Sequence, residues 1–200
     1  MLVAACGKSS GAPAAVPEAD PAGAASIAAA MIANAPSPAM VRDCTHADLG
    51  GGFAVTQRSL LAIAGKPIAK DPEHDVWMNP PELDAPAAQT LARPDADAKA
   101  KRQAAAQLLA APFYVVYRID NVDAPLALGV KELKRSTVSA RVIRYEKNGR
   151  PTCATLFLFQ EQKAVSDDAI ARSDKTLVDP AVAETIRRDL TAQLLAHAPR

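Results

Sequence analysis

The chain has 200 residues, with 23 Lys and Arg against 22 Asp and Glu, and its net charge of +1 gives no overall attraction to nucleic acid or acidic lipid. It contains no run of about 18 apolar residues, so no transmembrane helix is predicted. Its length fits one domain around one hydrophobic core, preceded by a short N-terminal segment.

The N-terminal region begins with a short apolar run that ends at Cys6, and residues 7–23 are rich in Ala, Pro, Gly and Ser. Such a composition is typical of a flexible tether. No basic residue precedes Cys6 and only five residues do, so a complete signal segment would have to begin further upstream.

The sequence Val3-Ala4-Ala5-Cys6 resembles the lipobox of bacterial lipoproteins. The resemblance implies that Cys6 carries a lipid, palmitate among its acyl chains, and that the protein faces the periplasm from the cell envelope. The residue after Cys6 is Gly7 and not an aspartate, and in this the sequence resembles lipoproteins that some bacteria send to the outer membrane. Residues 1–5 are then the remnant of a signal segment, residues 6–23 the anchor and tether, and residues 24–200 a single domain. An ordinary Ala-rich N-terminus with a chance cysteine is the alternative.

The first half of the domain is predicted to hold one clear helix. The apolar residues of 24–33 favour that helix, and residues 36–52 are expected to form a loop. Residues 53–64 are apolar, and periodicity does not decide between a helix and a buried strand. Residues 65–94 contain many prolines and the single tryptophan, Trp77, and they are predicted to be irregular.

The second half has stronger signals. We expect a helix from Asp95 to about Ala110, because Asp95 is a suitable N-cap. Phe113 to Asp120 alternates as a strand does, and residues 126–133 form a weaker strand. The Asp179-Pro180 pair predicts the start of a C-terminal helix that reaches about His197.

Asn148-Gly149 is the favoured pair of a type I′ hairpin turn. A turn there sets Lys147 opposite Arg150. The same register predicts three cross-strand pairs: Val138 with Phe159, Ala140 with Phe157, and Val142 with Thr155. The other face is expected to be half buried, and it carries Ile143, Arg141, Leu156 and Leu158. Strands in succession between helices predict an α+β fold, with an antiparallel sheet packed against N-terminal, middle and C-terminal helices.

The cysteine count is three: Cys6, Cys44 and Cys153. A lipid on Cys6 would leave an even pair, and an exported protein folds in an oxidising compartment. We therefore predict a Cys44–Cys153 disulfide; two separate buried thiols are the alternative.

Two histidines lie among groups that could support chemistry. His46 follows Cys44 by two residues, and His74 lies among Asp71, Glu73 and Asp75. The first pair could act as nucleophile and base, and the second group could bind a cation through oxygen ligands. Neither spacing matches a known catalytic or metal motif, so we predict no catalytic residue, no metal and no cofactor.

Basic residues gather between Lys131 and Arg150. Trp and Arg are common at the centres of interfaces, so Trp77, Arg141 and Arg144 are the predicted binding residues. The function expected is a lipid-anchored protein-binding module that recognises an envelope or secreted protein, as an inhibitor (immunity-type) or assembly accessory, with no nucleic-acid partner. A periplasmic small-ligand carrier with a pocket lined by Ile143, Leu156 and Leu158 is the alternative. A hydrolase that uses His46 or His74 is a third.

Overall fold

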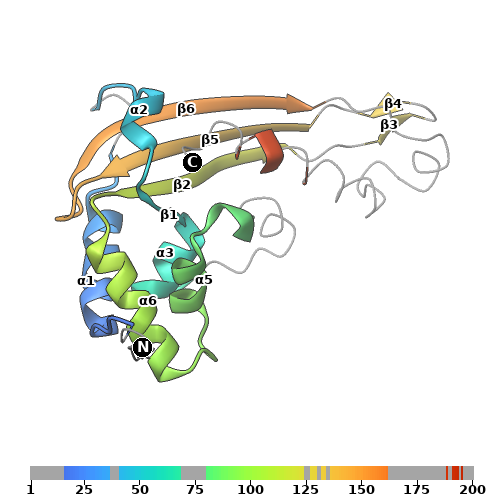
Figure 1. Cartoon of the computed structure of the whole chain (residues 1–200). Coiled ribbons are helices and arrows are strands. Elements are labelled where there is room, and N and C mark those ends of the chain that lie inside the picture. The colour runs from blue at the N-terminus through green and yellow to red at the C-terminus, as the bar shows by residue number, and fades with distance from the viewer. Residues whose placement is uncertain are drawn as a thin grey trace, which may run out of the picture.

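The computed structural model describes residues 16–36, 41–68, 80–123, 127–129, 132–133, 136–161, 188, 191–193 and 195. A four-stranded sheet packs against helices (Figure 1), which confirms the predicted α+β class. The elements in chain order are α1 (Pro21–Ala33), α2 (His46–Leu49), β1 (Phe53–Thr56), α3 (Gln57–Ile63), the 3-10 helix η1 (Pro81–Leu83), α5 (Pro86–Ala92), α6 (Ala98–Ala110), β2 (Tyr114–Asp123), β3 (Ala127–Gly129), β4 (Glu132–Leu133), β5 (Ser136–Tyr145) and β6 (Pro151–Glu161).

The strand order of the main sheet is β1-β2-β5-β6. Strands β2, β5 and β6 are antiparallel as expected, whereas β1 pairs with β2 in parallel, with Phe53 opposite Tyr114. Parallel neighbours need a crossover connection, and α3, η1, α5 and α6 form it here. The expected strand over residues 126–133 is instead two short strands, because β3 and β4 pair with each other.

Aspartate caps set where the two longest described helices begin. Asp20 accepts a hydrogen bond from the first turn of α1, and Pro21 occupies the first helical position, so α1 starts three residues before the predicted start at Ala24. In α6 the cap is Asp97 and not Asp95. Asp95 instead pairs with Arg93, at 2.7 Å.

The segment from Pro80 to Ala92 was predicted to be irregular, and this prediction is wrong. It forms η1 and α5, each with a proline at its first turn, namely Pro81 and Pro86. Proline is compatible with that position because the first-turn N–H groups have no partner inside the helix. Leu83 and Ala88 then join the buried core.

The register of the β5–β6 hairpin agrees with the prediction. Val138 lies opposite Phe159, Ala140 opposite Phe157, and Val142 opposite Thr155. The alternation of apolar and polar residues fixed this register, since a slip of one residue would turn every side chain to the other face.

The turn itself differs from the predicted two-residue type I′. Gly149 has a φ of +78°, but Asn148 keeps a negative φ, and a type I′ turn needs both angles to be positive. The N–H of Gly149 donates to the carbonyl of Glu146, and Glu146 also pairs with Arg150. The loop thus has three residues and ends in a left-handed glycine. An irregularity between Arg144 and Tyr145 then restores the predicted register.

The sheet has two halves that differ in what lies beneath them. In the half next to the hairpin turn, here called the turn half, one face packs on α1, α3, α5 and α6 (Figure 1). Its core residues on that face are Phe53, Val55, Tyr114, Val116, Ile143 and Tyr145, which meet small helix residues such as Ala24, Ala28 and Ala105. Beyond them the strands continue past these four helices as the far half, which carries Arg118, Asp120, Arg141, Leu156 and Leu158 on the same face.

The hairpin turn packs closely on α1. A Cβ atom on Gly149 would lie 2.8 Å from Cβ of Ala30 and 3.0 Å from the backbone N of Met31. Asn34, at the end of the helix, donates to the carbonyl of Gly149. The glycine is therefore required twice, for its backbone angle and for its lack of a side chain.

Several predictions fall on residues that the structure does not describe. They include Cys6 and most of the C-terminal helix, of which residues 188, 191–193 and 195 are described and helical. No helix within the described ranges has the length and apolar character needed to cross a bilayer.

Candidate functional site

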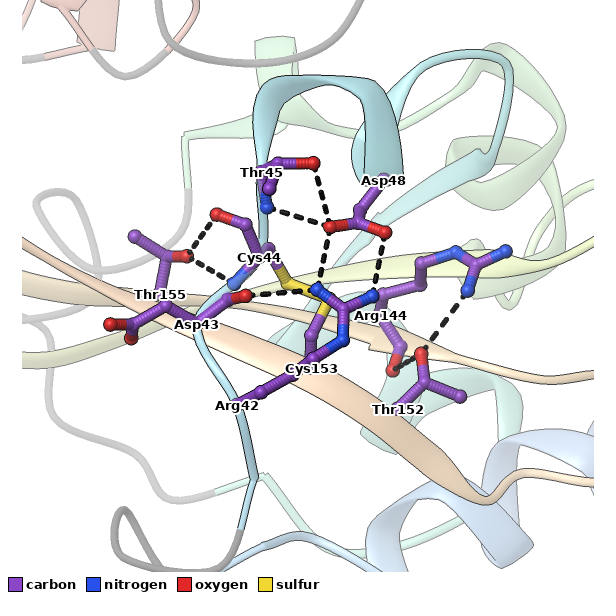
Figure 2. Close-up of a disulfide and its surroundings, with 9 residues drawn as sticks. All are labelled: Arg42, Asp43, Cys44, Thr45, Asp48, Arg144, Thr152, Cys153 and Thr155. Atoms are coloured by element: carbon purple, nitrogen blue, oxygen red, sulfur yellow. Dashed lines mark hydrogen bonds and ion pairs between the residues drawn. A yellow bond between two sulfur atoms is a disulfide. The ribbon is translucent and has the colours of Figure 1, made fainter.

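The predicted disulfide between Cys44 and Cys153 is present and joins residues 109 apart in the sequence (Figure 2). Cys153 is fully buried and lies next to Ala154, which packs on the helix side of the sheet. Consecutive strand residues point to opposite faces, so the disulfide is on the face away from α1 and α6. It holds the segment Val41–Leu49 (called the strap) against β6.

Backbone contacts extend this attachment along β6. The N–H of Ala154 donates to the carbonyl of Arg42 at 3.0 Å, in a parallel bridge. Thr155 Oγ1 accepts from the N–H of Cys44 and donates to its carbonyl, at 3.0 and 3.1 Å (Figure 2). The strap therefore adds a short extended piece to the outer edge of β6 before the chain turns away into α2.

Asp48 connects residues within the strap. Its carboxylate accepts hydrogen bonds from the N–H and hydroxyl of Thr45 and forms a two-pronged ion pair with Arg42, with distances of 2.7 and 2.8 Å (Figure 2). The Arg42 guanidinium, together with the Thr45 donors, holds the pKa of Asp48 well below its usual range. These contacts keep the strap in one shape and leave Asp48 no proton at neutral pH.

Arg144, a predicted binding residue, lies beneath the strap and makes contacts within the fold. Its guanidinium carbon lies 4.3 Å from the centre of the Phe113 ring, and Nη1 donates to Thr152 at 3.3 Å. Its Nε is buried, and no hydrogen-bond partner for it occurs among the described residues. These contacts tie Arg144 to the fold around the disulfide.

Arg141, the second predicted arginine, lies on the opposite face of β5. A spacing of three residues in a strand separates the two arginines in this way, so they do not form one basic face. Arg141 donates to both oxygens of Asp120, and Arg118 pairs with the same carboxylate at 2.8 Å. Asp120 reaches both because it occupies a bulge between Ile119 and Asn121.

Two leucines lie beside this charge cluster on the far half. The register sets Leu156 opposite Arg141 and Leu158 opposite Ser139, and the leucines are 58% and 74% exposed. Large apolar side chains that are this exposed, and adjacent on one face, are typical of interaction surfaces. We call Leu156 and Leu158 with the Arg118–Asp120–Arg141 cluster the leucine–arginine patch.

Tyr145 borders this patch from the turn half. Burial raises the pKa of its hydroxyl to about 12, although Arg118 and Arg141 act in the opposite direction. The phenol therefore stays neutral at every physiological pH, and the charge of the patch is set by two guanidinium groups and one carboxylate.

A buried polar cluster is the feature that the sequence did not reveal. Asp84 accepts hydrogen bonds from the N–H and hydroxyl of Thr56 and, at 2.7 Å, from the hydroxyl of Ser59. Burial raises the pKa of Asp84. All three side chains are buried and satisfied, and they join η1 to the β1–α3 junction. An open pocket of about 440 Å³ adjoins them, but their hydrogen bonds serve the fold.

The other predicted site residues lie outside the described residues or have side chains that the structure does not describe. Trp77, His74 and the carboxylates beside His74 lie outside the described residues, as do Lys131, Lys134 and Arg135 of the basic stretch. His46 is the first residue of α2, and its side chain is not described. Within the described ranges, His, Cys, Asp and Glu nowhere gather in threes as a metal ion would require.

One feature of the sequence, the predicted hairpin register, could have indicated the leucine–arginine patch. The predicted hairpin register already placed Arg141, Leu156 and Leu158 on one face, next to Ile143. It could not show that the face divides, with Ile143 1% exposed under the helices and the two leucines on the surface. Comparison with models of protein families, with curated proteins and with solved structures finds no match to this chain.

Proposed function

We propose that this chain is a lipid-anchored protein-binding module of the bacterial cell envelope, and that the leucine–arginine patch is its recognition surface. The observation that carries the proposal is the exposure of Leu156 and Leu158, which lie on one face of β6. Apolar side chains next to a partly exposed guanidinium are the usual chemistry of a protein interface.

The rigidity of the platform supports this role. The patch lies on three antiparallel strands, and β6 is fixed to the strap by the Cys44–Cys153 disulfide. A surface that is already ordered loses little entropy when it binds. The disulfide also agrees with an oxidising compartment, and the lipobox-like Val3-Ala4-Ala5-Cys6 sequence supports attachment to the envelope.

The charge of the patch indicates the kind of partner. Two arginines share the single carboxylate of Asp120, which leaves one positive charge in excess beside two leucines. Arg118 is the more exposed arginine, with 35% of its side chain accessible. The partner surface that fits is apolar with an acidic group at its border, on an envelope or secreted protein that the module inhibits or helps to assemble.

Small-ligand carriage has less support in the described structure. That alternative placed Ile143, Leu156 and Leu158 around one pocket. Ile143 is packed in the core, whereas both leucines face outward, so the three do not enclose a common space.

The test is capture by the oxidised full-length chain from the envelope fraction of the source cell, with quantification by mass spectrometry. We expect a stoichiometric partner that binds the wild-type chain and is lost with the Leu156→Ser/Leu158→Ser double variant. Val16→Ser is the matched control, because Val16 is also an exposed apolar residue, at 56%, and lies near the start of α1. A blank, or a partner that the double variant keeps, would contradict the proposal.

A further inference from the structure

Strand β6 is the last strand of the sheet, and one side of its backbone faces outward. The N–H of Ala154 donates away from β5, to the strap. In a strand, alternate residues direct their N–H and C=O groups to the same side. Leu156, Leu158 and Gln160 therefore direct theirs outward as well, along the outer edge of β6.

The strap covers only the beginning of this edge. Its last contacts with β6 are those between Cys44 and Thr155, after which Thr45 caps α2 and the chain leaves the sheet. In the part of the chain that the structure describes, no strand pairs with the outward side of residues 156–161. Within the described ranges, the edge therefore accepts an extended segment at its start and has no pairing strand beyond it.

Among the described residues, no strand pairs with the outer side of β2 beyond β1, and charged residues occur along this second edge. On β2 the pairing with β1 ends at Tyr117, and the following residues include Arg118, Asp120 and Asp123. Charged residues are a common device against edge-to-edge pairing. The run Leu156-Phe157-Leu158-Phe159-Gln160 on β6 has neither a charge nor a proline. This difference marks the β6 edge as the one built to receive another strand.

We propose that the outer edge of β6 pairs with the same edge of a second copy of this chain, antiparallel, about a two-fold axis at Leu158. Residue 158 then lies opposite its own copy, and Leu156 lies opposite Gln160 on both sides of the axis. All of these residues have outward backbones, so each facing pair exchanges two backbone hydrogen bonds. A two-fold axis needs one self-complementary surface, and this uncharged strand provides it.

The placement of the four helices under the turn half leaves room for this pairing. Helices α1, α3, α5 and α6 lie under the turn half, and the antiparallel arrangement puts the two sets at opposite ends of the joined sheet (Figure 1). The axis is perpendicular to the sheet, so both leucine–arginine patches lie on the same face. The inference goes beyond the proposed function, because self-association would present two patches side by side to one partner.

The test is the mass of the oxidised full-length chain in solution, measured by sedimentation equilibrium over a range of concentrations. We expect twice the mass of one chain. Leu158→Lys and Leu158→Glu should each weaken self-association on the order of tenfold or more, because like charges would meet across the axis. An equimolar mixture of the two variants should restore the dimer, since lysine then faces glutamate. Circular dichroism checks that both variants are folded.

A Gln160→Pro variant distinguishes self-association through the β6 edge from partner binding by the leucine–arginine patch. The N–H of residue 160 points outward, so proline there removes no hydrogen bond to β5 and leaves both leucines in place. A monomeric Gln160→Pro variant that still captures the partner would support both proposals. A wild-type monomer at every concentration, or a dimer that both charge variants leave unchanged, would overturn the two-fold pairing and leave partner capture to be judged alone.

Discussion

The turn half and the far half of the sheet share the three long strands β2, β5 and β6, yet the same sheet face is used differently in each. In the turn half, Tyr114, Ile143 and Tyr145 are buried against alanine-rich helices. In the far half, the same face carries an ion-paired cluster and two exposed leucines. On this face the turn half is packed against helices and the far half is exposed, and continuous strands hold the second in a fixed position relative to the first.

Removal of the disulfide should have the largest effect. A Cys44→Ala/Cys153→Ala variant is expected to lose about 4–5 kcal/mol of unfolding free energy, since the crosslink closes a loop with a sequence separation of 109 residues. Urea denaturation with and without a reductant measures the loss. If the reduced wild-type chain were as stable as the oxidised chain, the crosslink would contribute nothing to stability.

A matched pair of truncations tests the two halves directly. Ile143→Ala should cost about 2–5 kcal/mol, because it leaves a cavity in the packed core. Leu156→Ala, on the same face but exposed, should cost less than about 1 kcal/mol. Equal losses in urea denaturation would mean that the far half is packed like the turn half.

The buried carboxylate of the turn half should come next. Asp84→Asn is expected to cost about 1–3 kcal/mol at neutral pH, because an amide cannot accept all the hydrogen bonds that Thr56 and Ser59 donate. Asp95→Asn is the control, since Asp95 is exposed and its ion pair is worth little. A control that loses as much as Asp84→Asn would contradict this account.

The pH dependence of the unfolding free energy gives a second test of Asp84. Burial raises the pKa of Asp84, so the folded state keeps that proton to a higher pH than the unfolded chain does. The resulting stability is greatest below the unfolded pKa near 4 and falls as pH rises through the folded value. Asp84→Asn should remove this slope, and denaturation at several pH values checks it.

The ion-paired cluster of the far half should have the smallest effect. Asp120→Asn is expected to cost about 1 kcal/mol, because the cluster is only partly buried and guanidinium groups can be rehydrated. Thermal denaturation measures this loss. The same variant leaves two unpaired arginines in the patch, so it should alter partner capture more than it alters stability.

Part of the fold could be predicted from patterns and counts in the sequence. The β5–β6 register followed from alternation, and the disulfide followed from an odd number of cysteines. The opposite positions of Arg141 and Arg144 could have been read from their spacing of three in a strand. The parallel pairing of β1 could not be predicted from the sequence. The Asp84 cluster could not be predicted either, since Thr56 and Asp84 are 28 residues apart and no local pattern links them. The division of one sheet face into two halves depends on where helices end in space.

The contact between Gly149 and α1 has a consequence for how this sequence can change over time. A side chain at position 149 would collide with Ala30 and with the backbone of α1, and the left-handed angle disfavours it independently. Any lineage in which the turn acquires a larger residue must therefore also displace the helix and replace the turn. We expect the small residues at positions 30 and 149 to persist together or to be lost together, however freely the patch on the far half diverges.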